Sequence, residues 1–139
     1  MKFFRYALLL AALAGGALLT ASCEKNYLTS FVPDLYLEGT YNSFEVAPVI
    51  DEIRNYMIGK GCTVGSHVQF DASSEKSCKK QLAAFMDDMV ARISKPDIDA
   101  IVQDSRLDKL QFCYGVRDAE ENPDGTVAYL YRWNYSYSK

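Results

Sequence analysis

The stretch LQFCYGVRDAEENPDGTVAYLYRWNYSY, residues 110–137, decides the fold, because two alternating runs flank one polar segment. In the first run, Leu, Phe, Tyr and Val alternate with Gln, Cys, Gly and Arg over residues 110–117. The second run alternates again over residues 127–137. Alternation with a period of two is typical of half-buried β-strands. Residues 118–125 contain the turn formers proline, aspartate and glycine, so we predict a C-terminal β-hairpin.

Two stretches before the hairpin have helical periodicity. A helix is predicted over residues 47–58, and glycines at 59 and 61 end it. Its apolar side chains recur at helical spacing opposite charged ones: Val46, Val49, Ile50, Ile53 and Met57. A second helix is predicted over residues 74–94, where Pro96 prevents continuation. One or two further helical turns are expected at residues 97–104.

Two shorter strands are expected at residues 35–41 and 62–71, the latter best supported at residues 67–70. The order strand, helix, strand, helix, strand, strand predicts an α+β fold with two layers. In this fold, a small, mostly antiparallel sheet is covered on one face by two helices and ends in the C-terminal β-hairpin. No third layer remains for the second face, which we expect to be partly open to water.

The chain begins with MKFFRYALLLAALAGGALLTASC, residues 1–23. Lys2 and Arg5 precede an uncharged, mostly aliphatic run, and three small residues then lead to Cys23. A basic start, an apolar middle and a small-residue end are the three parts of an export signal. The apolar run of about 14 residues is short for a membrane span, which needs roughly 20.

This segment resembles the signal peptide of bacterial lipoproteins, in which Ala21-Ser22-Cys23 matches the lipobox. Thr20 stands where that pattern most often has leucine. The resemblance implies that residues 1–22 are removed and that Cys23 carries a diacylglyceryl group and an acylated amino terminus, with fatty acids such as palmitate. Two or more acyl chains give stable anchoring. An ordinary secretory signal and an uncleaved anchor helix are the alternatives.

The same resemblance places the protein in the cell envelope, and Glu24 after the cysteine favours the outer membrane over the inner membrane. Residues 23–33 then form a lipid-anchored tether, part of which is apolar enough to pack on the domain. Residues 34–139 form a single α+β domain. Removal of residues 1–22 leaves 13 basic against 18 acidic residues, a net charge of −5. Because the basic residues form no stripe, no nucleic-acid partner is predicted.

The cysteines that remain after lipidation are odd in number: Cys62, Cys78 and Cys113. An oxidising envelope permits one disulfide among them. Unless Gly65 and Ser66 fold the segment back, a pair between Cys62 and Cys78 is disfavoured, because an intervening strand would separate them by roughly 30 Å, whereas a disulfide needs Cα atoms within about 7 Å. A free, buried Cys113 is equally consistent. No metal site or cofactor is predicted, since there is no C-x-x-C spacing and one histidine.

The sharpest candidate binding feature is a row of aromatic residues at alternate positions of the last strand: Tyr129, Tyr131, Trp133, Tyr135 and Tyr137. Alternate residues share one face of a strand, so we expect all five rings on one side. If that side faces the helices, the rings belong to the core, and core or mixed burial is the more common outcome. If it faces solvent, it is a platform for sugar rings or a partner protein, with Tyr129, Tyr131, Trp133 and Tyr135 as speculative binding residues.

Other polar side chains have plainer interpretations. Glu120, Asn122 and Asp124 echo the start of a calcium loop but lack its closing acid, so we interpret them as a turn. Asp87 and Asp88 are adjacent on a helix and point about 100° apart, too far for a shared proton. His67 has no nucleophile motif near it, and no catalytic residue is predicted.

These observations predict a non-enzymatic, lipid-anchored envelope protein that presents a small binding or structural domain. One alternative is a glycan-binding surface lipoprotein that uses Trp133 and the flanking tyrosines. Another is an inhibitor of an envelope hydrolase, in which the acidic residues 118–125 enter a cationic cleft. An enzyme is the least favoured class.

Overall fold

The computed structural model describes residues 30–70, 73–121 and 123–139, with the side chains of residues 119–121 left undescribed. The protein has an α+β fold, as the sequence predicts. Three helices and two small antiparallel sheets are present in these residues. In chain order the elements are β2 (Ser30–Phe31), β3 (Asp34–Leu37), α1 (Ser43–Gly59), β4 (Val68–Gln69), α2 (Glu75–Ala91), α3 (Lys95–Gln103), β5 (Lys109–Glu121) and β6 (Val127–Ser138). None of these helices is long and apolar enough to cross a membrane.

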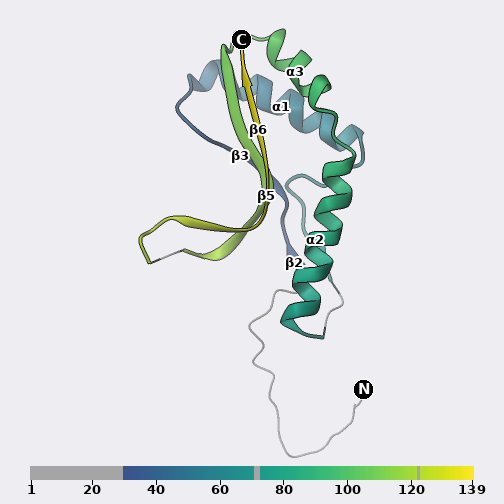
Figure 1. Ribbon diagram of the computed structural model, residues 1–139. Coiled ribbons are helices and arrows are strands. Elements are labelled where there is room, and N and C mark those ends of the chain that lie inside the picture. Colours follow the sequence, from purple (N-terminus) through teal and green to yellow (C-terminus); the bar gives the residue numbers. More distant parts are fainter. Residues whose placement is uncertain (1–29, 71–72, 122) are drawn as a thin grey trace, which may run out of the picture.

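The predicted hairpin is confirmed and forms most of the main sheet. Strands β3, β5 and β6 lie in that order, and both pairings are antiparallel. Helices α2 and α3 lie on one side of the hairpin, and α1 crosses behind its upper half (Figure 1). The far end of the hairpin bends away from the helices and projects from the body of the molecule (Figure 1).

The predicted strand at residues 62–71 is wrong over most of its length. Among residues 62–70, the described part of that range, only Val68–Gln69 form a strand, and this strand pairs with β2 rather than with the main sheet. Residue 71 lies outside the described residues. Gly61 and Gly65 both have positive φ angles, so the segment that leads to Val68 turns instead of forming an extended strand. The pairing also holds residues 30–31, which precede the predicted domain, against the rest of the chain. Phe31 is buried in the core.

The predicted strand at residues 35–41 ends early, at Leu37. Gly39 has a φ angle of 103°, which turns the chain out of the sheet. The hydroxyl of Tyr41 then takes the place of a strand residue. It accepts a hydrogen bond from the Gln111 N–H at 2.8 Å and donates one to the Glu38 carbonyl at 2.8 Å. Beyond the end of β3, the backbone N–H of Gln111 on β5 is therefore satisfied by a side chain.

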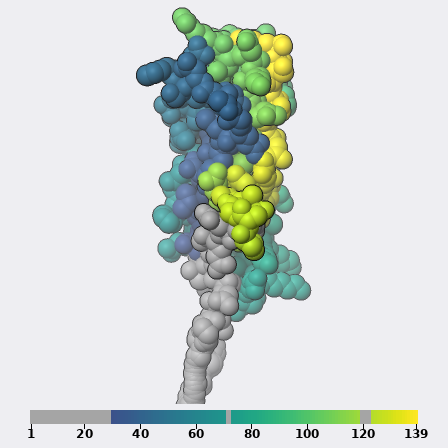
Figure 2. Space-filling view, turned by 90° about the vertical axis from the view of Figure 1, so that its left-hand side faces the viewer, coloured from purple at the N-terminus to yellow at the C-terminus, as the bar shows by residue number. Residues whose placement is uncertain are grey.

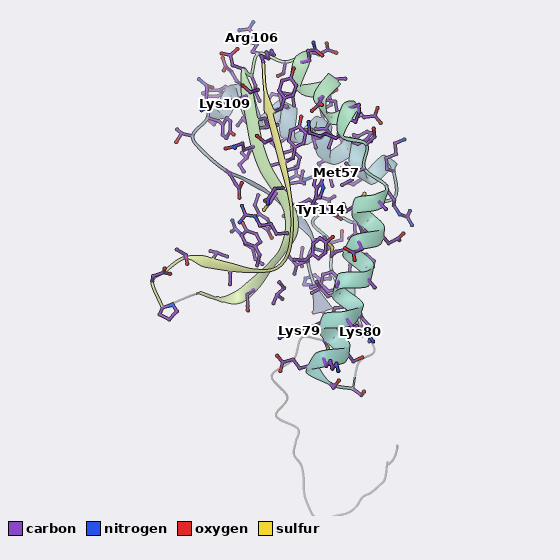
Figure 3. The ribbon with its side chains drawn as sticks, viewed as in Figure 1. Met57, Lys79, Lys80, Arg106, Lys109 and Tyr114 are labelled. Atoms are coloured by element: carbon purple, nitrogen blue, oxygen red, sulfur yellow. The ribbon has the colours of Figure 1, made fainter. Side chains whose placement is uncertain are left out.

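The three helices follow their sequence signals closely. Helix α1 begins four residues before the predicted range, because the side chain of Asn42 caps it by accepting from the N–H groups of Phe44 and Glu45. Its predicted apolar face is buried: Val46, Val49, Ile50, Ile53 and Met57. Met57 and Tyr114 point into the interior between hairpin and helices (Figure 3). The short helix expected near residues 97–104 is α3, with Pro96 in its first turn.

Tyrosine hydroxyls tie the helices to their neighbours at three points. Tyr131 and Tyr135 of β6 donate to Asp87 of α2 at 2.7 Å and to Asp99 of α3 at 2.6 Å. Tyr56 of α1 donates to Asp97 of α3 at 2.9 Å. Hydrogen bonds to charged acceptors are stronger than neutral ones, so these contacts fix the helices on the sheet. The contact with Tyr131 also gives Asp87 a structural role that its position in the sequence did not indicate.

The hairpin contains a β-bulge, which lies beside a position where only glycine fits. Val116 pairs with Tyr131 and Arg117 pairs with Tyr129, so Leu130 has no partner in β5. The strands approach so closely that a Cβ atom on Gly115 would lie 2.2 Å from the Tyr131 carbonyl oxygen. The φ angle of Gly115 is not positive, so space rather than backbone conformation selects the glycine.

We therefore expect Gly115→Ala to lower the free energy of unfolding by about 1–3 kcal/mol, the usual cost of overpacking. The matched control is Gly59→Ala at the end of α1, where a Cβ meets nothing within 4 Å. That change should leave stability unchanged or raise it by up to about 1 kcal/mol. Urea titration of both variants measures the difference, and equal midpoints would contradict the close approach of the strands.

Alkaline pH should destabilise the fold through the tyrosines on β6. Burial and the hydrogen bond to Asp87 raise the pKa of Tyr131 from 10 to about 12, and burial also raises the pKa of Tyr135. Below pH 10 both phenols are protonated in the folded and unfolded chains, and this contribution is intact. As the pH rises from about 10 toward 12, the unfolded chain loses these protons first, so stability falls.

The measurement is urea unfolding at a series of pH values, with tyrosinate absorbance followed in parallel. Tyr131→Phe should make the decline above pH 10 shallower, while costing about 1 kcal/mol near pH 8 through loss of the hydrogen bond. A decline with the same slope in both proteins would show that Tyr131 does not contribute.

Candidate functional site

The predicted aromatic row is divided between the two faces of the sheet. Tyr131, Trp133, Tyr135 and Tyr137 share the face of β5 that carries Leu110, Phe112, Tyr114 and Val116, which is the helix-covered side. Tyr135 is 2% exposed and stacks on Phe112 with ring centroids 4.9 Å apart. Tyr131, Trp133 and Tyr137 are half-buried. The mixed burial that the sequence favoured is therefore what these four rings have.

Tyr129 lies on the opposite face, so the expectation of five rings on one side is wrong at this residue. The bulge at Leu130 shifts the alternation by one position and pairs Tyr129 with Arg117. The ring of Tyr129 lies 5.8 Å from that of Tyr36 on β3, in an edge-on arrangement. One extra residue in β6 thus moves an aromatic side chain from the core side to the open side.

On this open face, four side chains form what we call the arginine–tyrosine cluster: Tyr36, Arg117, Tyr129 and Arg132. The Arg117 guanidinium lies 3.9 Å from the centroid of the Tyr36 ring and 5.7 Å from that of Tyr129. The Arg132 guanidinium lies 4.8 Å from the Tyr129 centroid. Such contacts are attractive because the ring faces carry negative charge. Both arginines are exposed and both tyrosines half-buried.

The two arginines differ in their partners. Arg132 forms an ion pair with Glu38, and its Nε donates to the Asn134 side chain at 2.6 Å. Arg117 has no carboxylate partner in the described part of the chain. Its one hydrogen bond there is a long contact of 3.4 Å from Nε to the Tyr129 hydroxyl. The guanidinium of Arg117 is therefore held in place by rings while its charge stays available.

The phenols of the cluster stay neutral across the physiological range. Burial raises the pKa of Tyr36, and the nearby Asp34 carboxylate raises it further. Burial also raises the pKa of Tyr129, opposed by its hydrogen bond with Arg117. The cluster thus presents fixed positive charge and neutral hydroxyls, which can hold an anion or a sugar but are poorly matched to proton transfer near pH 7.

A buried thiol lies beneath the cluster. Cys113 faces the same side as Tyr36 and Tyr129 and is fully buried. Burial raises the pKa of all three described thiols, Cys62, Cys78 and Cys113, and none of them forms a disulfide. The extended strand that was expected to separate Cys62 from Cys78 is absent from the described residues, so the distance argument against that pair does not apply. Thiols that are buried and protonated are poor nucleophiles, so they belong to packing.

The remaining candidate residues take the plainer roles. The Asp124 carboxylate accepts from the Thr126 N–H and hydroxyl, which makes a turn and lowers the pKa of Asp124. The side chains of Glu120 and Asn122 lie outside the described residues, so the calcium-like spacing has no described counterpart. His67 is exposed just before β4. The residues whose side chains are described contain no group of three that could hold a metal ion.

A hollow of about 550 Å³ lies at the opposite end of the domain from β2, where the start of α1 meets the α3–β5 connection. Its walls are contributed by Asn42, Phe44, Glu45, Pro48, Val49, Glu52, Ser105 and Arg106. Arg106 points outward at this end (Figure 3), and Phe44 is 89% exposed at the rim. The charges here are mixed, and no buried polar group is directed into the hollow.

Sequence reasoning missed three of the four residues of the cluster: Tyr36, Arg117 and Arg132. Alternation along β3 does place Tyr36 on the other face of the strand from Leu35, so the position of Tyr36 on the open face could have been predicted from the sequence. The bulge that brings Tyr129 to Arg117 leaves no mark in the composition of β6. Cys23, the predicted lipidation site, lies outside the described residues.

Comparison of the chain with family models gives no match, and comparisons with curated proteins and with solved structures give none either.

Proposed function

We propose that this protein is a lipid-anchored, non-enzymatic envelope protein that presents its α+β domain as a binding module. The lipobox-like segment that ends in Cys23 supports the anchor, and Glu24 favours the outer membrane. The binding surface is the open face of the main sheet (Figure 2), which the projecting hairpin end borders. Binding there requires no reaction at a nucleophile or a proton shuttle, only recognition by fixed charge and rings.

One observation carries the binding role: the Arg117 guanidinium is stacked 3.9 Å from the Tyr36 ring centroid and has no carboxylate partner among the described residues. The domain carries excess negative charge, yet no described carboxylate pairs with this arginine, while Glu38 neutralises Arg132 beside it. A stacked guanidinium loses little conformational freedom on binding and presents its N–H groups in a fixed plane. This is the arrangement that a ligand carboxylate meets in a bidentate contact.

The anchor is tested by Cys23→Ala in the native host, followed by membrane fractionation and labelling with a fatty acid. We expect this variant to lose the fatty-acid label and to leave the membrane fraction that contains the acylated protein, because the thiol is the acylation site. Ser22→Ala is the matched control, since it keeps a small residue in the lipobox and should keep the label. Unchanged incorporation in Cys23→Ala would contradict the anchor.

An acidic glycan is the ligand class that the cluster favours. Sugar rings pack on tyrosine faces, and Arg117 supplies a counter-charge for a uronic-acid carboxylate. The glycan-binding alternative therefore moves from Trp133 and Tyr135, which face the helices, to Tyr129 and Tyr36. Of the four speculative binding residues, Tyr129 is the one that joins the open face.

The probe for this ligand class is polygalacturonate, with its methyl-esterified form as the uncharged counterpart. Arg117→Gln should weaken polygalacturonate binding about tenfold, because one charge-assisted contact is lost. Arg106→Gln removes an exposed arginine at the far end of the domain and should leave binding unchanged (Figure 3). Equal binding of the ester, or equal losses in both variants, would contradict the site.

A further inference from the structure

Strand β6 forms an open edge of the main sheet along its whole length. The strand order β3-β5-β6 leaves β6 with a neighbour on one side only. Its length is 12 residues, against four for β3 at the other edge. A long edge strand is a template for pairing with another strand, because every second residue offers an unpaired N–H and C=O.

The ladder identifies which residues offer these groups. The Lys139 N–H donates to the Asp108 carbonyl at 2.8 Å, which makes Lys109–Ser138 a non-hydrogen-bonded pair. Bonded and non-bonded pairs alternate, so Arg132, Asn134 and Ser136 also belong to non-bonded pairs. The N–H and C=O groups of these residues are directed away from β5, toward the outer edge.

No other part of the described chain satisfies that edge. The backbone groups of residues 127–138 form no hydrogen bond there outside the ladder with β5. The strand has no proline, and its one charged residue is Arg132, already paired with Glu38. Proline, lysine and a short strand are devices that normally prevent pairing at an edge, and β6 has none of them. A β-bulge is another such device, but the bulge of β6 lies at Leu130, so residues 131–138 keep a regular register with β5.

The side chains of β6 also leave apolar surface at this edge. Trp133 and Tyr137 remain half-buried although they face the helices. Tyr131 is likewise half-buried, beside its hydrogen bond to Asp87. A further strand beside β6 would place a second row of side chains against these rings and complete their burial.

We propose that β6 pairs antiparallel with β6 of a second copy of this chain, joining two three-stranded sheets into one of six strands. A second copy supplies an edge of the same length with the same near-neutral charge, so an acidic protein meets no repulsion along the seam. A twofold axis uses the same edge on both partners and leaves no β6 edge exposed. A foreign peptide would need an equally long strand with little charge, and no side chain on this edge is arranged to recognise such a peptide.

The antiparallel arrangement has a geometric consequence for anchored chains. The described chain starts beside α2 at one end of the molecule, and β6 finishes at the other end (Figure 1). Twofold pairing through β6 therefore puts the two amino-terminal ends at opposite ends of the dimer. If both chains are anchored in one bilayer, the dimer lies with its long axis along the membrane.

The test compares Ser136→Pro with Ser136→Ala in the full chain, purified in detergent. Proline removes an N–H that points away from β5 and places its ring on the outer edge, which an edge strand tolerates. Alanine removes the same hydroxyl but keeps the N–H. Sedimentation equilibrium should give a dimer for the unchanged chain and for Ser136→Ala, and a monomer for Ser136→Pro, with circular dichroism showing that all three are folded.

The emission of Trp133, the single tryptophan of the chain, provides a second readout. It should shift to the blue as the protein concentration rises through the dimerisation range, and Ser136→Pro should abolish the shift. Should Ser136→Pro fail to fold, Ser136→Cys in the otherwise unchanged chain replaces it: its partner on β5 is Gln111 rather than a cysteine, the native described thiols are buried, and oxidation should yield a cross-linked dimer. A monomer at all concentrations, or a dimer that Ser136→Pro leaves intact, would overturn the proposal.

Discussion

The antiparallel ladder between β5 and β6 is the constraint on which the rest of the structure depends. It runs from Lys109–Ser138 to Glu121–Val127 and provides the surface on which the helices pack. The core residues of β5 are fully or almost fully buried by that packing: Leu110, Phe112, Tyr114 and Val116. Hydroxyl groups on β6 then bind aspartates on α2 and α3, so the strand both fills the core and positions the helices. Apolar burial gives the stability, and these polar contacts fix the geometry.

One of the two irregularities in this ladder, the bulge at Leu130, separates the residues of the core from those of the candidate site. Leu130 is the extra residue, and beyond it the side chains of β6 exchange faces. Tyr135 and Trp133 remain with the helices, whereas Tyr129 joins Tyr36 and Arg117 on the open side. The close approach of strands at Gly115 lies beside the same irregularity. Bulges commonly redirect a side chain at a functional surface, and here the redirected side chain is an aromatic ring beside an arginine that has no carboxylate partner in the described part of the chain.

The sequence predicted the α+β class, the hairpin and the helices well, because each depends on a periodic pattern or a local stop signal. The buried face of α1 is the clearest case, since all five of its members were identified by spacing. The strand at residues 62–71 failed, because Gly61 and Gly65 adopt positive φ angles that alternation does not reveal. The face of Tyr129 failed for a different reason: a bulge is a property of two strands in register, and neither strand alone encodes it. Arg117 was therefore invisible as a site residue until its neighbours were placed.

The most direct test of this account is a set of nuclear Overhauser contacts from the ring protons of Tyr129 in the folded protein. The bulge predicts contacts between the rings of Tyr129 and Tyr36, whose centroids lie 5.8 Å apart. It also predicts contacts between Tyr135 and Phe112 on the other face, with centroids 4.9 Å apart. Contacts from Tyr129 to the helix side of the sheet, with none to Tyr36, would show that the strand alternates without interruption and that the open face lacks the arginine–tyrosine cluster.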